Sequence, residues 1–169
     1  MTLDAHGIKP GARVGVHLTR TQDLPATQFG ILIHGSTFVP LDPGQPAARL
    51  ARIAELAGLQ AILSEEALEP LKSPATRILT RDITGTTPEA YPDRGTNAPA
   101  YVIFTSGTSG IPKGVVISRA ALSRYAQWAH NTFAKGQPLT WAVHSAIGFD
   151  LTITSIFAPL AHGLSLIHI

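Results

Sequence analysis

Short apolar runs alternate with longer amphipathic stretches along the chain, which is the pattern of strands that alternate with helices. Apolar runs typical of strands occur at 13–18, 38–39, 61–63, 77–79, 100–104, 115–117, 141–143 and 164–167. Stretches with helical spacing lie between them at 24–34, 46–57, 119–130 and 150–162. This alternation predicts an α/β fold, in which helices flank a largely parallel sheet.

Residues with capping chemistry stand at several of the predicted helix ends. Asp23 and Ser118 are expected to be N-caps, because their side-chain oxygens can accept bonds from the free N–H groups of a first helical turn. Gly58 is expected to end the second helix in the left-handed conformation. The first helix carries almost continuous apolar residues, which predicts burial on most of its sides.

Charged residues are scarce in this chain. They make up 14% of 169 residues, against roughly 25% in typical globular domains, while 44% of the residues are hydrophobic. This deficit suggests that other protein covers much of the chain, and a charge-poor but complete small domain is the alternative. The length suits one domain, and the polar stretch 81–99 is interpreted as a surface connector within it.

Composition also restricts the classes of partner and site. The net charge is +2 and the basic residues are scattered, so no nucleic-acid partner is expected. Cysteine is absent, which excludes disulfides and thiolate chemistry, and the histidines show no metal-ligand grouping, so no metal site is expected. No signal-peptide pattern is visible, and the apolar tract 151–169 is too interrupted to span a membrane. We therefore expect a cytoplasmic protein without a membrane partner.

A glycine-rich loop follows the apolar run 100–104. Residues 105–114 read TSGTSGIPKG, with three glycines, four hydroxyl residues and one lysine. Exposed backbone N–H groups, hydroxyls and a lysine can surround an anion, so the loop is predicted to bind the phosphates of ATP. Ligands of α/β sheets bind at the carboxyl ends of strands, which is where this loop begins. An ordinary glycine-rich turn between two strands is the alternative.

The loop is not of the Walker A type. That motif requires glycine directly before its lysine and serine or threonine directly after it. Pro112 precedes Lys113 here, and Gly114 follows it. A strand rather than a helix is also predicted after the loop.

The longer segment 101–115, YVIFTSGTSGIPKGV, resembles the signature of the acyl-adenylate-forming enzymes. That superfamily contains the adenylation domains of non-ribosomal peptide synthetases, the acyl-CoA ligases and firefly luciferase. Segment 30–43, GILIHGSTFVPLDP, continuing to Arg49 and Leu50, is similar to the peptide-synthetase motif around an AYVPLDP core. Segment 148–152, GFDLT, resembles the Phe-Asp motif of the same domains. The resemblance extends from about Gly11 onward.

The resemblance implies a two-step reaction. A carboxylate attacks the α-phosphate of ATP to give an acyl-adenylate and pyrophosphate, and a thiol then takes the acyl group. It also implies that Thr105 and Lys113 are catalytic. The residues implied to hold the β- and γ-phosphates are Thr105, Ser106, Gly107, Thr108, Ser109, Gly110 and Lys113.

Asp150 is the substrate residue that the resemblance points to. In amino-acid-activating members this aspartate pairs with the α-ammonium group of the substrate, and the positions of Leu151 and Thr154 line the side-chain pocket. The sequence Asp, Leu, Thr is similar to domains that select Asn or Asp. From the residues alone, Asp150 could instead cap the helix that follows, and both roles can coexist.

The resemblance further implies that 1–169 is part of an adenylation domain, incomplete at its C-terminal end and also at its N-terminal end. We expect the chain alone to be inactive and the Mg²⁺ ligand to lie beyond Ile169. The expected partners are an amino acid, the rest of the domain and a peptidyl carrier protein in cis or in trans. The alternatives are part of an acyl-CoA or aryl-acid ligase, or a non-catalytic nucleotide-binding module.

Overall fold

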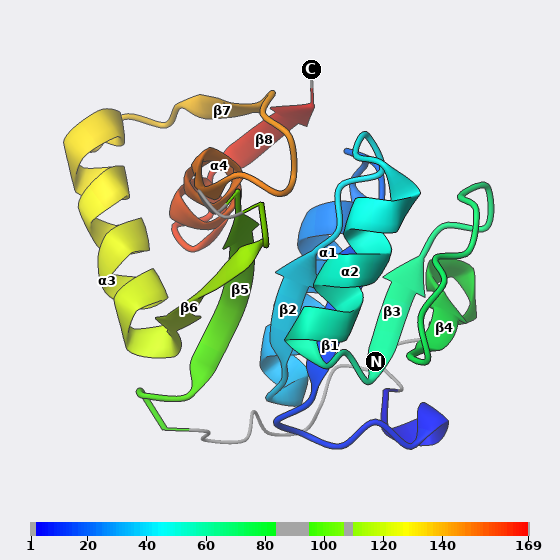
Figure 1. Cartoon of the computed structure of the whole chain (residues 1–169). Helices are drawn as coiled ribbons and strands as arrows, with labels where there is room; N and C mark the ends of the chain where they lie inside the picture. The colour runs from blue at the N-terminus through cyan, green and yellow to red at the C-terminus, as the bar shows by residue number, and fades with distance from the viewer. Residues whose placement is uncertain (1–2, 84–94, 107–109, 169) are drawn as a thin grey trace.

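The computed structural model has a twisted sheet with helices on both faces (Figure 1). It describes residues 3–83, 95–106 and 110–168. Within these residues the main sheet has six strands in the order β4-β3-β1-β2-β5-β6. Its strands are β1 (Arg13–His17), β2 (Thr37–Pro40), β3 (Ala61–Ser64), β4 (Thr76–Leu79), β5 (Pro99–Thr105) and β6 (Lys113–Ser118). All neighbouring pairs are parallel except β5 and β6, which are antiparallel.

The core consists of two clusters of buried side chains, and the sheet separates them. The helices are α1 (Asp23–His34), α2 (Ala47–Ala57), α3 (Arg119–Ala129) and α4 (Asp150–Leu160), with short turns η1 (Asp4–His6), η2 (Thr80–Asp82) and η3 (His130–Ala134). Helix α2 packs on one face, where its Leu50 and Ile53 join Val102 of β5. Helices α1, α3 and α4 pack on the other face. Central strands are therefore covered on both sides, as a mostly parallel sheet requires.

The last two strands form a separate sheet. Strands β7 (Thr140–Val143) and β8 (Ser165–His168) pair in parallel, and α4 connects them. The sequence pattern predicts both strands but does not assign them to a second sheet, because apolar periodicity identifies strands and not their partners.

The predicted helix ends are confirmed in two cases out of three. Ser118 is the N-cap of α3, and its Oγ accepts a hydrogen bond from the N–H of Ala121 at 3.2 Å. Gly58 closes α2 with a φ of 60°. The prediction for Asp23 is wrong, because Gln22 is the N-cap of α1 and no side chain caps the helix. Asp23 is instead the first helical residue, where a negative charge still favours the helix dipole.

Helix α1 is less buried than its composition predicts. Leu24 and Ile31 are fully buried, but Ile33 is 37% exposed and Ala26 is exposed as well. The helix packs one face against the sheet, so an apolar run wider than that face leaves some side chains outside. The π-helix η3, which extends α3, was also not predicted from the sequence.

Phe38 of β2 lies in the larger cluster, on the face of the sheet that α1, α3 and α4 cover, and its ring contacts two other aromatic rings. It is fully buried, and its ring stacks on Tyr101 of β5 at 5.4 Å and on Phe157 of α4 at 5.8 Å between centroids. These contacts fix β5 and α4 relative to each other. Both elements end or begin at the cavity described below.

Phe38→Ala should lower the free energy of unfolding by about 3–5 kcal/mol, because it removes a buried ring and leaves a cavity between β2, β5 and α4. Phe133→Ala is the matched control, since Phe133 is 52% exposed and its loss should cost less than about 1 kcal/mol. Urea denaturation measures both values. Equal losses in the two variants would contradict the structural role given to Phe38.

Candidate functional site

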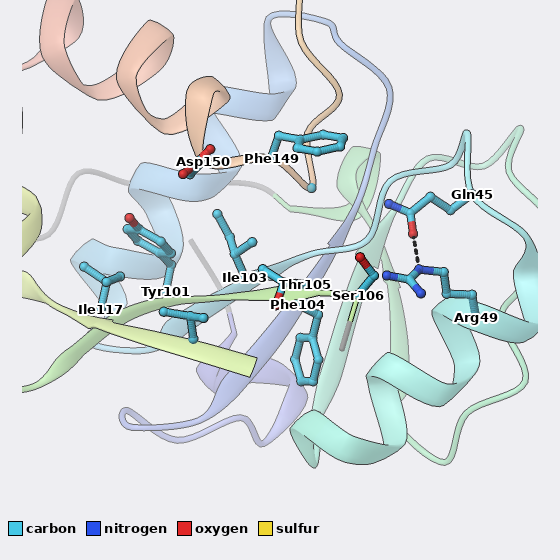
Figure 2. Close-up of a pocket in the computed structure, with 12 residues that line it drawn as sticks. Gln45, Arg49, Tyr101, Ile103, Phe104, Thr105, Ser106, Ile117, Phe149 and Asp150 are labelled. Carbon is cyan, nitrogen blue, oxygen red and sulfur yellow. Dashed lines mark hydrogen bonds between the residues drawn. The ribbon is translucent and has the colours of Figure 1, made fainter. Parts of the chain in front are cut away.

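A cavity of about 460 Å³ lies at the carboxyl end of β5 (Figure 2). Segments from four places in the chain meet there: the start of α2, the strands β5 and β6, and the start of α4. The residues that line the cavity are Gln45, Arg49, Tyr101, Ile103, Phe104, Thr105, Ser106, Val115, Ile117, Gly148, Phe149 and Asp150. The position agrees with the general rule that α/β sheets bind ligands beyond the carboxyl ends of their strands.

The glycine-rich loop is the connection of a β-hairpin between β5 and β6. Thr105 ends β5, and it pairs with Lys113 at the start of β6. Thr105 and Ser106 line the cavity. Gly110 has a φ of 77°, a conformation in which glycine avoids the strain of a Cβ atom. The predicted phosphate ligands Gly107, Thr108 and Ser109 lie outside the described residues.

Lys113 is exposed at the start of β6 and is not among the described residues that line the cavity. Gly114, the next residue, has a packing reason to be glycine. A Cβ atom there would lie 3.0 Å from Cζ of Phe104 and 3.0 Å from Cγ1 of Val102. The absence of a side chain at Gly114 therefore lets the Phe104 ring pack beside the base of the hairpin and form part of the cavity wall.

Asp150 is exposed at the cavity and is the first residue of α4 (Figure 2). Phe149 is the N-cap of this helix and no side-chain oxygen caps it, so the capping role considered for Asp150 is wrong. None of the ion pairs among the described residues involves Asp150. A carboxylate beside an otherwise largely apolar wall, without a cationic partner of its own, is suited to bind an ammonium group.

Tyr101 lies next to Asp150 in the cavity wall (Figure 2). Burial, followed by the negative charge of Asp150 and the nearby Tyr125, raises the pKa of the Tyr101 phenol to about 12. The phenol is therefore neutral at pH 7 and keeps an O–H donor. Sequence reasoning treated Tyr101 only as part of a strand, because alternation does not show which strand residues reach a cavity.

Leu151 and Thr154 line a different hollow from Asp150. This second hollow, of about 470 Å³, is formed by α3, β7 and α4, and its wall includes Tyr125 and Trp128. Thr154 is buried, and its Oγ1 lies 2.7 Å from Oη of Tyr125. Leu151 is 49% exposed. The structure thus does not bring the three predicted substrate residues into one cavity, since successive helical residues point about 100° apart.

Gln45 and Arg49 are cavity residues that sequence reasoning missed. Nε of Arg49 donates a hydrogen bond to Oε1 of Gln45 at 2.8 Å. A signal was available, because Arg49 stands in the first turn of a helix, where a positive charge opposes the helix dipole. An arginine at such a position indicates a contact outside the helix.

The described residues hold no group of three His, Cys, Asp or Glu side chains that could bind a metal ion. Among the helices in the same part of the chain, none has the length and apolar character needed to cross a membrane.

The fold is an α/β fold, and its cavity at the carboxyl edge of the sheet is lined by the start of the glycine-rich segment and by the Asp150 carboxylate. A sequence model of the family described as AMP-binding enzyme matches residues 1–169. The chain therefore belongs to the AMP-binding enzyme family, which confirms the resemblance drawn from segment 101–115.

Two relatives are each about one-third identical to the chain over the aligned residues. Syringomycin synthase SyrB1 from Pseudomonas syringae pv. syringae is 34% identical over 163 residues, covering 93% of this chain and 26% of that protein. Bacitracin synthase 3 from Bacillus licheniformis is 35% identical over 160 residues, covering 93% of this chain and 2% of that protein. The chain thus spans about a quarter or less of the length of these relatives.

A solved structure confirms the predicted fold class. The nonribosomal peptide synthetase FmoA3, in its AMPPNP-bound form, superposes with a TM-score of 0.87 at 31% identity. The match covers 99% of this chain and 18% of that chain. The mostly parallel sheet and its flanking helices are therefore similar to those of a part of this peptide synthetase.

Tyr101 should make stability depend on pH in alkaline solution. The phenol ionises near its ordinary pKa of 10.0 when unfolded but near about 12 when folded, so the folded state binds more protons between these values. The Tyr101 contribution is fully present below pH 10 and is lost as pH rises through the folded pKa. Urea denaturation at stepped pH should show a shallower decline for Tyr101→Phe than for the wild type. Parallel declines would contradict the raised pKa.

Proposed function

We propose that the enzyme containing this chain activates an amino acid with ATP and passes the aminoacyl group to the thiol of a carrier protein. In this proposal residues 1–169 are part of an adenylation domain. The observation that carries it is one cavity that combines the start of the glycine-rich hairpin with the carboxylate of Asp150, which has no ion-pair partner among the described residues. Membership of the AMP-binding enzyme family and similarity to syringomycin and bacitracin synthases support it.

The hairpin is assigned to the phosphates. An oxygen of the substrate carboxylate forms a bond to the α-phosphorus of ATP, and the bond from that phosphorus to the oxygen bridging the β-phosphate breaks. Pyrophosphate leaves with the electron pair. We assign stabilisation of its charge to Thr105, Ser106, Gly110 and Lys113, together with residues 107–109, because positioned donors that face developing charge lower the barrier of phosphoryl chemistry.

Asp150 is assigned to the amino group of the substrate. A carboxylate without a cationic partner among the described residues favours an ammonium group over a neutral substituent, because a charge-assisted hydrogen bond is stronger than a neutral one. The neutral phenol of Tyr101 lies beside this carboxylate and supports its negative charge. Leu151 and Thr154 are proposed for the substrate side chain, which requires that their hollow and the cavity of Asp150 both face the bound amino acid.

We further propose that ATP is used with Mg²⁺. The described residues provide no group of metal ligands, so no residue is assigned to the ion and no step of the proposal passes through it. An acyl-CoA or aryl-acid ligase would need no partner for an ammonium group. The free carboxylate of Asp150 therefore favours an amino acid as the substrate.

Amino-acid-dependent exchange of pyrophosphate into ATP tests the proposal in the full-length enzyme. We expect exchange with one amino acid of a panel, with Asn and Asp the first to try. Asp150→Asn should abolish it, whereas Asp82→Asn, in the exposed turn η2, should not. Exchange with fatty or aryl acids alone would identify an acyl ligase, and ATP binding without exchange would identify a binding module; both outcomes contradict the proposal.

Lys113→Ala should slow the exchange by removing a cation from the proposed phosphate site. The expected loss is about 2–4 kcal/mol of transition-state stabilisation, a fall of roughly 30- to 1,000-fold in kcat/KM. Lys72→Ala is the control, since Lys72 is exposed in the segment before β4. Unchanged exchange in Lys113→Ala would remove Lys113 from the site.

A further inference from the structure

We infer that Arg49 is a further phosphate-binding residue, whose guanidinium holds phosphate oxygens of ATP beside Ser106. The inference rests on the proposed function and deepens it. Arg49 lies on α2, outside the sequence motifs 101–115 and 148–152 that contain the hairpin and Asp150. It therefore adds a third element to the site.

The geometry of Arg49 leaves most of its donors available. The side chain is partly buried, and its Nε–H donates to Oε1 of Gln45 at 2.8 Å. No residue in the described part of the chain accepts a hydrogen bond from Nη1 or Nη2 of Arg49. Figure 2 shows the guanidinium facing Ser106 at the start of the hairpin. A guanidinium fixed by one hydrogen bond can present its other N–H groups to two phosphate oxygens at once.

The charge of Arg49 is not compensated within the described residues. The ion pairs recorded there do not include it, and the first turn of α2 contains no acidic residue. Arg52, three residues later on the same helix, has a compensated charge by contrast, because its Nη1 pairs with Oε2 of Glu55 at 2.6 Å. A cation in the first turn of a helix opposes the helix dipole. An anion bound at this point interacts favourably with the guanidinium and with the dipole together.

The two charges of the cavity stand on separate elements. Arg49 and Asp150 are the charged residues among the described lining, one on α2 and the other on α4. Figure 2 shows Arg49 on the side of Ser106 and Asp150 on the side of Tyr101. This separation matches a substrate pair with an ammonium group at one end and phosphates at the other. We therefore assign Arg49 to the phosphates of ATP and not to the carboxylate of the amino acid.

Gln45 contacts both the Arg49 side and the Asp150 side of the cavity. Besides accepting from Arg49, it packs closely on Gly148, where a Cβ atom would lie 3.3 Å from Nε2 of Gln45. Gly148 is two residues before Asp150. Gln45 is thus a positioning residue, which holds the Arg49 guanidinium against the segment that presents Asp150.

Steady-state exchange kinetics of the full-length enzyme test the inference. Arg49→Met keeps the aliphatic stem and removes the charge, so the KM for ATP should rise about tenfold or more, the effect of losing a hydrogen bond to a charged group. The KM for the amino acid should change less than about twofold, because Asp150 is untouched. Arg49→Lys should give an intermediate KM for ATP, since an ammonium keeps the charge without the planar fork. Arg52→Met, on the same helix, is the matched control and should leave both values unchanged.

A rise in the KM for the amino acid instead of ATP would show that the guanidinium binds the substrate carboxylate, and the inference would be overturned. Unchanged KM values in Arg49→Met would reduce the residue to a structural role. If Arg49→Met does not fold, the KM for ATP is measured with Arg49→Lys instead. An unaltered KM for ATP in Arg49→Lys then overturns the inference. If the wild type shows no exchange, the proposed function fails, and the inference on Arg49 is then tested by calorimetry of ATP binding. Weaker ATP binding by Arg49→Met than by the wild type supports the inference. Equal ATP binding overturns it.

Discussion

The stacking of Phe38 between Tyr101 and Phe157 is the contact on which the arrangement of the site depends. Strands β2 and β5 are neighbours in the sheet, and the side chains of their paired residues Phe38 and Tyr101 stack on each other. The same ring fixes α4 through Phe157. Buried aromatic rings provide large apolar contact area and prefer particular relative orientations. The carboxyl end of β5 and the first turn of α4 are therefore held at a defined position, and the cavity lies between them.

Tyr101 belongs both to this core and to the site. Its ring packs on Phe38, while its phenol lies beside Asp150 in the cavity wall. Burial and the charge of Asp150 raise the pKa of the phenol, so the group beside Asp150 stays uncharged even in moderately alkaline solution. The packing of the sheet and the electrostatics of the site are thus consequences of one side chain.

Local sequence signals predicted the elements well because each depends on neighbouring residues. The Ser118 cap and the Gly58 helix end need only the first or last helical turn. The strand, loop and strand around 105–113 need only the glycines and the apolar runs beside them, but the antiparallel pairing of the two strands was not predicted. The assignment of β7 and β8 to a second sheet and the approach of Arg49 to Ser106 depend on contacts between distant segments. The separation of Leu151 from Asp150 depends on how α4 is rotated against its neighbours. None of these can be read from local periodicity.

The separation of Arg49 from Asp150 explains how one cavity could align two substrates under the proposed function. Helices α2 and α4 pack in the two clusters on opposite faces of the sheet, and their residues meet at its carboxyl edge. An ammonium bound at Asp150 and phosphates bound at Arg49 and the hairpin place the substrate carboxylate between the two charges, where the α-phosphate must lie. Fixing both ends in this way supplies much of the orientation that a reaction between two molecules otherwise loses as entropy. Gln45 accepts a hydrogen bond from Arg49 and lies close to Gly148, so it contacts both the α2 side and the α4 side of the cavity.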